Sequence, residues 1–243
     1  MLYDSERPMK KIYTTLRQVV KATAFLGMLA TTSPVQAQEV TYNTEGWYGT
    51  AALSKIINTE SSGMQANLGS GVIRPGEIDY NGNFVGMLAV GHENSFCRKN
   101  NTPIYLRTEG DYLMGSADRK SATVDQYHTV LDDSVDFRAL FANALLGIKD
   151  TQHTRWWLGG GIGYGWVDRP AITGCSSTCS FAAATTDGFA WQLKAVVERT
   201  ISKDAALFAE ARYVALPGES NSTSQCYDDI NVATLGIGFR SYF

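Results

Sequence analysis

The nine residues LGIGFRSYF, Leu235 to Phe243, end the chain on an alternating pattern. Leu235, Ile237 and Phe239 fall on one side of an extended strand, and so does the terminal Phe243. Side chains of a β-strand point alternately to two faces, so this pattern predicts a strand with one apolar side. The ends of soluble domains usually fray, whereas this apolar side continues to the last residue. A strand that stays paired to its end is typical of a closed barrel.

The first 37 residues have the organisation of a secretory signal peptide. Lys10 and Lys11 precede a short apolar run, Ala22 to Ala30, which is followed by the small-x-small cleavage site ending at Ala37. This run is far shorter than the roughly 20 residues that a helix needs to cross a bilayer. We therefore expect residues 1–37 to be a signal peptide, with Met9 as an alternative start, and residues 38–243 to be the mature domain.

The charge of the chain disfavours one class of partner. It has 21 Lys and Arg against 24 Asp and Glu, and residues 1–37 contain five of the bases but only two of the acids. The mature domain is therefore acidic, which argues against nucleic acid as a partner because phosphates would be repelled. It also lacks any later apolar run of helix-spanning length, so strands are the only elements with which it could cross a membrane.

Eight segments of the mature chain are rich in β-branched, aromatic and small residues, and several of them alternate. They are Gly46–Ser54, Asn83–His92, Ile104–Met114, Val135–Ile148, Arg155–Trp166, Gly188–Val197, Ala205–Val214 and Asn231–Phe243. Long polar connections, at 55–82, 115–134, 167–187 and 215–230, alternate with short ones at 93–103, 149–154 and 198–204. This is the pattern of an all-β, eight-stranded, antiparallel up-and-down transmembrane β-barrel.

Charged residues share one face of several predicted strands. Arg107, Glu109 and Asp111, for example, oppose apolar neighbours. In a barrel that faces lipid, such charges must line the interior. The predicted interior charges are Arg107, Glu109, Asp111, Arg138, Lys194, Glu210, Arg212 and Arg240. An eight-stranded interior is only wide enough to be filled by side chains, so the sequence favours a plug of ion pairs and leaves open a switchable ion gate.

The glycines of WWLGGGIGYGW, residues 156–166, have a structural explanation. Glycines that face inward make room in a narrow barrel for large side chains on the strands opposite. A phosphate-binding loop is the other interpretation of these glycines, and the absence of a following helix pattern disfavours it.

The mature chain resembles the small eight-stranded outer-membrane proteins of the opacity and OmpA-like β-barrel superfamily. The pieces that carry the resemblance are GWYGTAAL from residue 46, LRTEGDYLMG at 106–115, WLGGGIGYGW at 157–166, FAWQLKAVV at 189–197, LFAEARYV at 207–214 and the terminal LGIGFRSYF. In that family the terminal Phe of the last strand is the recognition signal for the assembly machinery. The resemblance assigns that role here to Leu235, Ile237, Phe239 and Phe243, although Ser241 departs from the usual aromatic or apolar residue.

The resemblance also implies a location and partners. We expect a monomer in the bacterial outer membrane that contacts membrane lipid, lipopolysaccharide and the assembly machinery, with a host or cell-surface ligand as a further partner. Family members include adhesins, immune-evasion proteins, narrow pores and haem binders. The expected function is a structural or adhesion-type role through four long extracellular loops. A low-conductance porin is the alternative, and an envelope-lipid enzyme is the second alternative.

Cysteine and histidine residues are the remaining candidates for chemistry. Cys175, Cys179 and Cys226 fall in predicted outer loops, so a disulfide between any two of them is open, whereas Cys97 falls at the opposite end. The cysteines lack the spacing of a metal site. His128 shares a loop with Asp132 and Asp133, which is a weak basis for catalysis. We therefore expect no catalytic residues, no metal and no cofactor.

Overall fold

The computed structural model describes residues 46–59, 62–67, 73–99, 102–124, 127–149, 153–176, 179–181, 183–218 and 225–243. The predicted signal peptide, its cleavage site at Ala37 and the alternative start at Met9 lie outside the described residues.

The described residues are almost entirely in β-strands. These are β1 (Gly46–Thr59), β2 (Ser62–Asn67), β3 (Ile73–Lys99), β4 (Thr102–Val124), β5 (Tyr127–Lys149), β6 (Thr154–Arg169), β7 (Ile172–Ser176), β8 (Cys179–Phe181), β9 (Ala184–Ser202), β10 (Ala205–Leu216), β11 (Gln225–Tyr227) and β12 (Ile230–Tyr242). In this part of the chain there is no helix long and apolar enough to cross a membrane.

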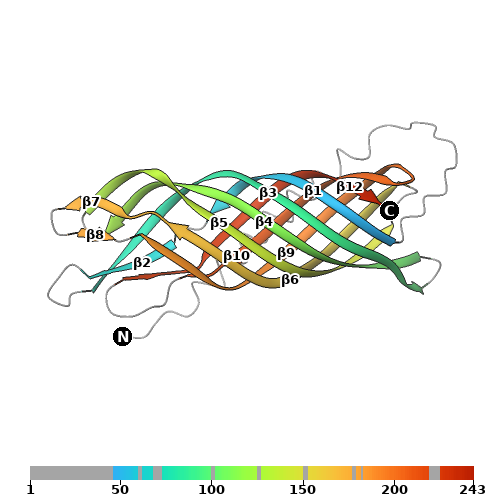
Figure 1. Cartoon of the computed structure of the whole chain (residues 1–243), viewed down its shortest axis with the longest axis horizontal. Helices are drawn as coiled ribbons and strands as arrows, with labels where there is room; N and C mark the ends of the chain where they lie inside the picture. The colour runs from blue at the N-terminus through green and yellow to red at the C-terminus, as the bar shows by residue number, and fades with distance from the viewer. Residues whose placement is uncertain are drawn as a thin grey trace.

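Eight of these strands close into a barrel (Figure 1). Their order around the ring is β1-β12-β10-β9-β6-β5-β4-β3, and β3 pairs again with β1. The closure is visible at Tyr48, which lies opposite Tyr242 of β12 on one side and Gly91 of β3 on the other. All of these pairings are antiparallel, which confirms the predicted eight-stranded antiparallel fold.

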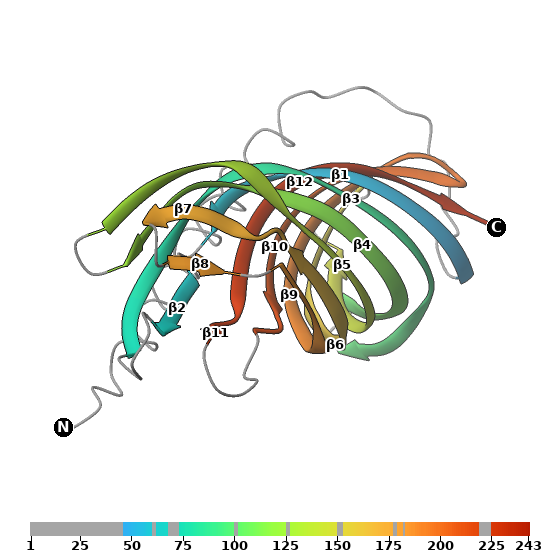
Figure 2. The same ribbon diagram turned by 60° about the vertical axis from the view of Figure 1, so that its left-hand side comes forward.

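The two ends of the barrel differ. At one end, called here the turn end, both Gly46 and Phe243 lie beside short connections such as Lys203-Asp204 between β9 and β10. At the other, the loop end, lie the longer connections and the small strands β2, β7, β8 and β11 (Figure 2).

The outer face of the barrel is apolar on every strand. Each of the eight strands exposes at least one large apolar side chain by 49% or more of its surface, namely Leu53, Leu88, Met114, Leu146, Leu158, Phe189, Leu207 and Ile237. The inside instead holds buried charged side chains in ion pairs, together with buried apolar side chains. A barrel with this reversed polarity is stable only when its outer face meets lipid, so these residues form the membrane-facing belt.

The strands are longer than the sequence patterns predicted. β3, β4 and β5 continue through parts of the predicted loops 55–82 and 115–134 and project beyond the belt. β2 pairs with the extended part of β3, and β11 pairs with β2. Extending two strands that are already paired adds hydrogen bonds without the entropy cost of closing a new loop. Polar segments can therefore continue a strand, and a polar composition does not mark where the strand ends. These segments were wrongly predicted to be entirely loop.

A second, smaller apolar core supports this projecting sheet. Ile78, Val124, Ile172 and Tyr227 are all at most 3% exposed and pack together with Ala122. They come from β3, β4, β7 and β11, so the core joins the projecting strands to the connections that cross the loop end. The loop end is therefore folded structure with its own packing.

Candidate functional site

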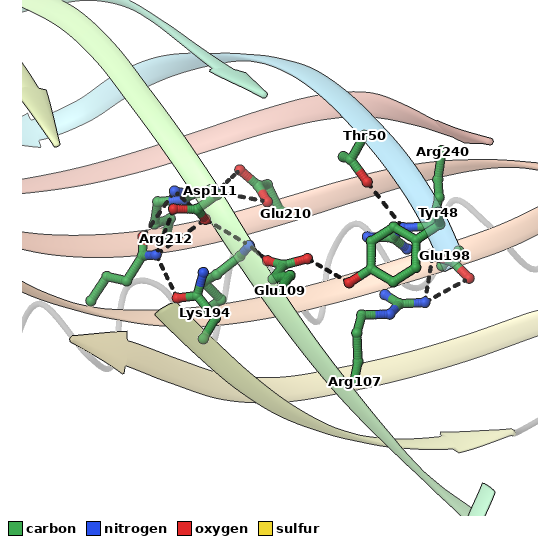
Figure 3. A network of polar contacts seen from close by, with 12 residues as sticks. Tyr48, Thr50, Arg107, Glu109, Asp111, Lys194, Glu198, Glu210, Arg212 and Arg240 are labelled. Carbon is green, nitrogen blue, oxygen red and sulfur yellow. Dashed lines mark hydrogen bonds and ion pairs between the residues drawn. The ribbon is translucent and has the colours of Figure 1, made fainter. Parts of the chain in front are cut away.

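The barrel interior holds two clusters of buried charges (Figure 3). The first charged cluster lies nearer the turn end and consists of Glu93, Arg107, Arg155, Glu198 and Arg240. The second lies nearer the middle and consists of Glu109, Asp111, Lys194, Glu210 and Arg212. The two clusters together contain five acids and five bases, so their charges balance.

Arg107 is the centre of the first charged cluster and is 0% exposed. Its Nη2 lies 2.6 Å from Glu93 Oε2 and 3.2 Å from Glu198 Oε2. Its guanidinium carbon lies 3.6 Å from the ring centre of Trp157, close enough for a cation–π contact. Arg155 pairs with both acids and Arg240 with Glu198, so each buried carboxylate has more than one basic partner.

Two tyrosines connect the clusters to their surroundings. Tyr242 Oη lies 3.2 Å from Glu93 Oε2 and 3.1 Å from Glu198 Oε1. Tyr48 donates a hydrogen bond of 2.9 Å to Glu109 Oε2 in the second cluster. Because Arg107 also lies 5.1 Å from the ring centre of Tyr48, this side chain bridges the two clusters.

Lys194 and Arg212 hold the second charged cluster together. Lys194 pairs with Glu109 and lies 3.3 Å from Asp111 Oδ2, and Arg212 Nη1 lies 3.3 Å from the same oxygen. Arg212 Nη2 lies 3.1 Å from Glu210 Oε1. Gln192, which is 1% exposed, donates to Asp111 at 3.2 Å. Buried charges of this kind are tolerated because each one is paired and hydrogen-bonded.

Above the second charged cluster, toward the loop end, the interior becomes apolar. Every barrel strand contributes one side chain that is at most 3% exposed, except for Phe137 at 4%. We call this set the collar, and it consists of Ile56, Val85, Leu113, Phe137, Val167, Ala190, Val214 and Val232. Its residues are apolar and do not stand out in the sequence, so the charge pattern that predicted the interior did not include them.

Two arginines close the loop end above the collar. Arg119 forms a bidentate pair with Asp133, with both N–O distances at 2.5 Å, and donates at 3.0 Å to the carbonyl oxygen of Pro170. Arg169 donates at 2.9 Å to Thr186 Oγ1 and at 3.3 Å to the carbonyl oxygen of Pro217. Both arginines are 2% exposed. They therefore fasten the chain that follows β6 and β10 to the mouth of the barrel.

The structure places seven of the eight predicted interior charges inside. These are Arg107, Glu109, Asp111, Lys194, Glu210, Arg212 and Arg240, each at most 6% exposed. Arg138 was wrongly predicted, because its side chain is 55% exposed on the outer face. Phe137, Ala139 and Phe141 of β5 face inward, so the alternation of the strand places Arg138 and Leu140 outside. Arg138 Nη2 lies 3.9 Å from Asp168 Oδ2 there.

Sequence reasoning missed three members of the first charged cluster, Glu93, Arg155 and Glu198. Glu93 and Glu198 were each the first residue of a predicted short turn, but the strands continue to Lys99 and Ser202. The alternation of side chains along the strand could have identified them. Glu198, for example, is four residues after Lys194 and therefore lies on the same face. Extending each alternating pattern by one pair would have found both acids.

The β6 glycines divide between the two faces. A Cβ at Gly161 would lie 2.0 Å from Asn143 Oδ1, and one at Gly163 would lie 2.7 Å from Phe141 Cδ1, so these two make room for inward side chains of β5. Gly160 lies on the outer face beside Leu193 instead, so it does not make room inside the barrel.

Three residues of the expected assembly signal, Leu235, Ile237 and Phe239, lie on the outer face of β12, and Phe243 directly follows that strand. Ile237 is 70% exposed, Phe239 45% and Phe243 80%, and Leu235 packs beside Tyr213 and Ala233. Their recognition by the assembly machinery stays a prediction.

The cysteines occupy four strands. Cys97 lies in β3, Cys175 in β7, Cys179 in β8 and Cys226 in β11. Their side chains lie outside the described residues, so the pairing of Cys175, Cys179 and Cys226 stays a prediction.

His128 lies in the projecting part of β5, with its Nδ1 3.3 Å from Thr123 Oγ1. Among the described residues no group of three or more His, Cys, Asp or Glu is placed to hold a metal ion.

Comparisons with known proteins add little to this geometry. No family model matches the chain, and no curated protein matches it either. The solved structures that it matches include Neisserial surface protein A, with 17% identity, a TM-score of 0.46, and coverage of 82% of this chain and 97% of that one. The outer membrane protein OprG of Pseudomonas aeruginosa has 12% identity, a TM-score of 0.43, and coverage of 82% and 97%.

The attachment invasion locus protein of Yersinia pestis, in complex with a heparin analogue, has 10% identity, a TM-score of 0.38, and coverage of 81% of this chain and 99% of that one. Likenesses at this level carry no argument about function. The assignment rests on the closed ring of eight strands, the charged interior and the apolar belt of this chain itself. The chain has the fold of a small eight-stranded transmembrane β-barrel.

Proposed function

We propose that this protein is a closed outer-membrane scaffold that makes adhesion-type contacts at the cell surface through its loop end. The observation that carries this proposal is the contrast between a filled interior and a folded loop end. Outer-membrane barrels have short periplasmic turns and long outer loops, so the loop end faces the exterior.

The interior supports a scaffold more than a pore. The two charged clusters fill the part nearer the turn end, and the collar then presents apolar side chains from all eight strands. A hydrated ion would have to lose its water to pass such a layer, because apolar side chains offer it no replacement ligands. A low-conductance channel is therefore the alternative that this geometry disfavours.

The loop end supports a contact surface. Its connections are fixed by Arg119 and Arg169 and by the small core around Ile78 and Ile172. A surface that is ordered before it binds loses less conformational entropy on binding, so the same contacts give higher affinity. The barrel then serves to hold this surface outside the membrane.

The partners in the membrane follow from the outer belt. Lipid contacts the apolar side chains, and lipopolysaccharide surrounds the barrel in the outer leaflet. We propose the assembly machinery as a transient partner of β12, through Ile237, Phe239 and Phe243, with Leu235 on the same face. We propose a monomer, since closure leaves no free strand edge within the belt.

The first test is single-channel conductance of the refolded protein in a planar bilayer. We expect no discrete steps, and we expect steps when Leu113 and Phe137 of the collar are both replaced by serine. Arg138→Ser on the outer face is the matched control, and heat-modifiable migration verifies that each variant is folded. Reproducible steps from the unmodified protein would contradict the scaffold and support the channel.

The second test concerns the contacts. Bacteria that display the protein are compared with bacteria that display a variant in which residues 171–183, which contain β7 and β8, are replaced by a short turn. We expect attachment to cultured host cells to fall while the barrel stays folded and inserted. Unchanged attachment would exclude this part of the loop end as the contact surface.

A further inference from the structure

The outer face of β9, β10 and β12 has a groove near the turn end. Two rows of residues that lie directly opposite one another in the register form it. The row nearer the turn end is Phe239, Leu207 and Arg199, and the next row toward the middle of the barrel is Ile237, Ala209 and Val197. The groove therefore follows β10, with β12 on one side and β9 on the other.

The groove is hollow because β10 carries small side chains between larger neighbours. Ala209 presents only a methyl group, whereas Ile237 beside it is 70% exposed. Ala211 follows on the same face, where it packs with Tyr213 and Trp191 and is only 1% exposed. The rings of these two aromatic residues are 5.5 Å apart. They close the groove toward the middle of the barrel.

The length of the groove matches one leaflet of the membrane. Tyr213 is six residues after Leu207, which corresponds to about 20 Å of extended strand. Strands of such barrels tilt by about 45°, so this length covers about 14 Å of depth, close to half of the roughly 30 Å hydrocarbon core. In the orientation proposed above, the turn end faces the periplasm. The groove therefore lies in the periplasmic leaflet, which consists of phospholipids.

A base stands at the turn-end limit of the groove. Arg199 lies directly opposite Leu207, which is 51% exposed, so both side chains are on the outer face. Ile201, two residues further toward the turn end, is also exposed there. The lipid-facing surface tolerates an arginine only close to the headgroups, where its long side chain reaches anionic groups. Among the described residues that line the groove, Arg199 is the one with a charged side chain, so this end is basic.

We propose that the groove binds one anionic phospholipid of the periplasmic leaflet. The guanidinium of Arg199 donates to the phosphate oxygens, which its planar geometry allows it to do bidentately. One acyl chain lies along β10 over Ala209, between Ile237 and Val197, and its end reaches Tyr213. This lipid site is separate from the contact surface at the loop end, and it depends only on the orientation of the barrel in the membrane.

Native mass spectrometry of the refolded protein, released from detergent micelles, tests this site because it counts the lipids that stay bound. The protein is titrated with phosphatidylglycerol and, in parallel, with phosphatidylcholine, which has the same phosphate and acyl chains but no net charge. We expect one phosphatidylglycerol to stay bound to each barrel and phosphatidylcholine to bind about fivefold more weakly. Equal binding of the two lipids would contradict a site for an anionic lipid.

The first pair of variants tests the phosphate contact. Arg199→Gln removes the charge and is expected to weaken phosphatidylglycerol binding at least about tenfold, because a hydrogen bond to a charged group is lost. Arg138→Gln makes the same substitution at an exposed arginine of the outer face, in the half of the belt nearer the loop end. This control is expected to leave binding unchanged.

The second pair of variants tests the acyl-chain contact. Ala209→Leu fills the groove and is expected to abolish retention of the single lipid, because the acyl chain loses its place against β10. Ala142→Leu makes the same substitution at an exposed position on the outer face of β5 and is expected to retain the lipid. Heat-modifiable migration verifies that all four variants are folded.

Two results overturn the proposal. If Arg199→Gln or Ala209→Leu binds phosphatidylglycerol as the unmodified protein does, the belt as a whole holds the lipid and the groove is not a site. If the spectrum shows two chains together and no lipid, a second copy of the chain covers the groove. Neither result bears on the contact function, which the attachment assay tests separately.

Discussion

The two regions of the barrel interior solve the same problem with opposite chemistry. Toward the turn end, ten charged side chains in two clusters fill the lumen with ion pairs, whereas the collar fills it with apolar side chains from all eight strands. A charged filling depends on every partner being present, because a buried unpaired charge is very costly. An apolar filling depends on volume and loses stability in proportion to the cavity created. The comparison teaches that one lumen can be specified by pairing in one layer and by packing in the next.

The largest expected effect is in the first charged cluster. Arg107→Ala removes the base that contacts both Glu93 and Glu198, and it leaves the two buried acids with fewer partners. We expect a loss of about 3–5 kcal/mol in the free energy of unfolding, measured by urea titration in lipid vesicles with tryptophan fluorescence. A loss below about 1 kcal/mol, in the range of an exposed pair, would show that Arg155 and Arg240 compensate and that the cluster is not a dependent unit.

The second expected effect tests the packing layer. Leu113 of the collar is 2% exposed, so Leu113→Ala leaves a cavity in the barrel interior. We expect a loss of about 2–5 kcal/mol in the same urea titration, without a change in charge balance. Leu113→Met conserves the volume and is the control, with an expected loss below about 1.5 kcal/mol. An equal loss in both variants would mean that the collar is not specified by packing.

The difference between the layers also explains what the sequence could and could not predict. The closed barrel and seven of the eight interior charges follow from a period of two, because charges such as Lys194 and Glu210 alternate with apolar neighbours on their strands. Arg138 defeats that reasoning because its neighbours are apolar on both faces, with Phe137 inside and Leu140 outside. Because both faces of β5 are apolar there, the alternation of its residues cannot show which face points into the barrel and which faces lipid.

The loop end was the least predictable region for a related reason. Composition marked residues 73–82, 115–124 and 127–134 as loops, yet they extend β3, β4 and β5. Their stability comes from contacts distant in sequence, such as Ile78 of β3 against Ile172 of β7 and Tyr227 of β11. A single sequence read by local pattern contains no signal for that packing.

The third expected effect tests the space between the two charged clusters. Gly91 lies against Tyr48, and a Cβ there would lie 2.3 Å from Tyr48 Oη and 2.6 Å from the carbonyl oxygen of Thr108. Gly91→Ala should therefore displace Tyr48 from Glu109 and cost about 1–3 kcal/mol. Gly49→Ala is the matched control on the outer face of β1, because its Cβ would meet only Phe243 at 3.9 Å. If the two variants unfold at the same urea concentration, the Tyr48 bridge contributes nothing to stability.

The smallest effect is expected for an arginine on the outer face, and it serves as the comparison for the buried Arg107. Arg138 and Asp168 are 55% and 46% exposed, and their charged atoms are 3.9 Å apart. An exposed pair gains little Coulomb energy and loses side-chain entropy, so Arg138→Ala should change the free energy of unfolding by less than about 1 kcal/mol. The same substitution at Arg107 removes the same charge and most of the same volume. The difference between the two urea midpoints therefore measures what burial adds to an arginine in this barrel. A cost at Arg138 as large as that at Arg107 would mean that the arginine charge stabilises this barrel wherever it lies.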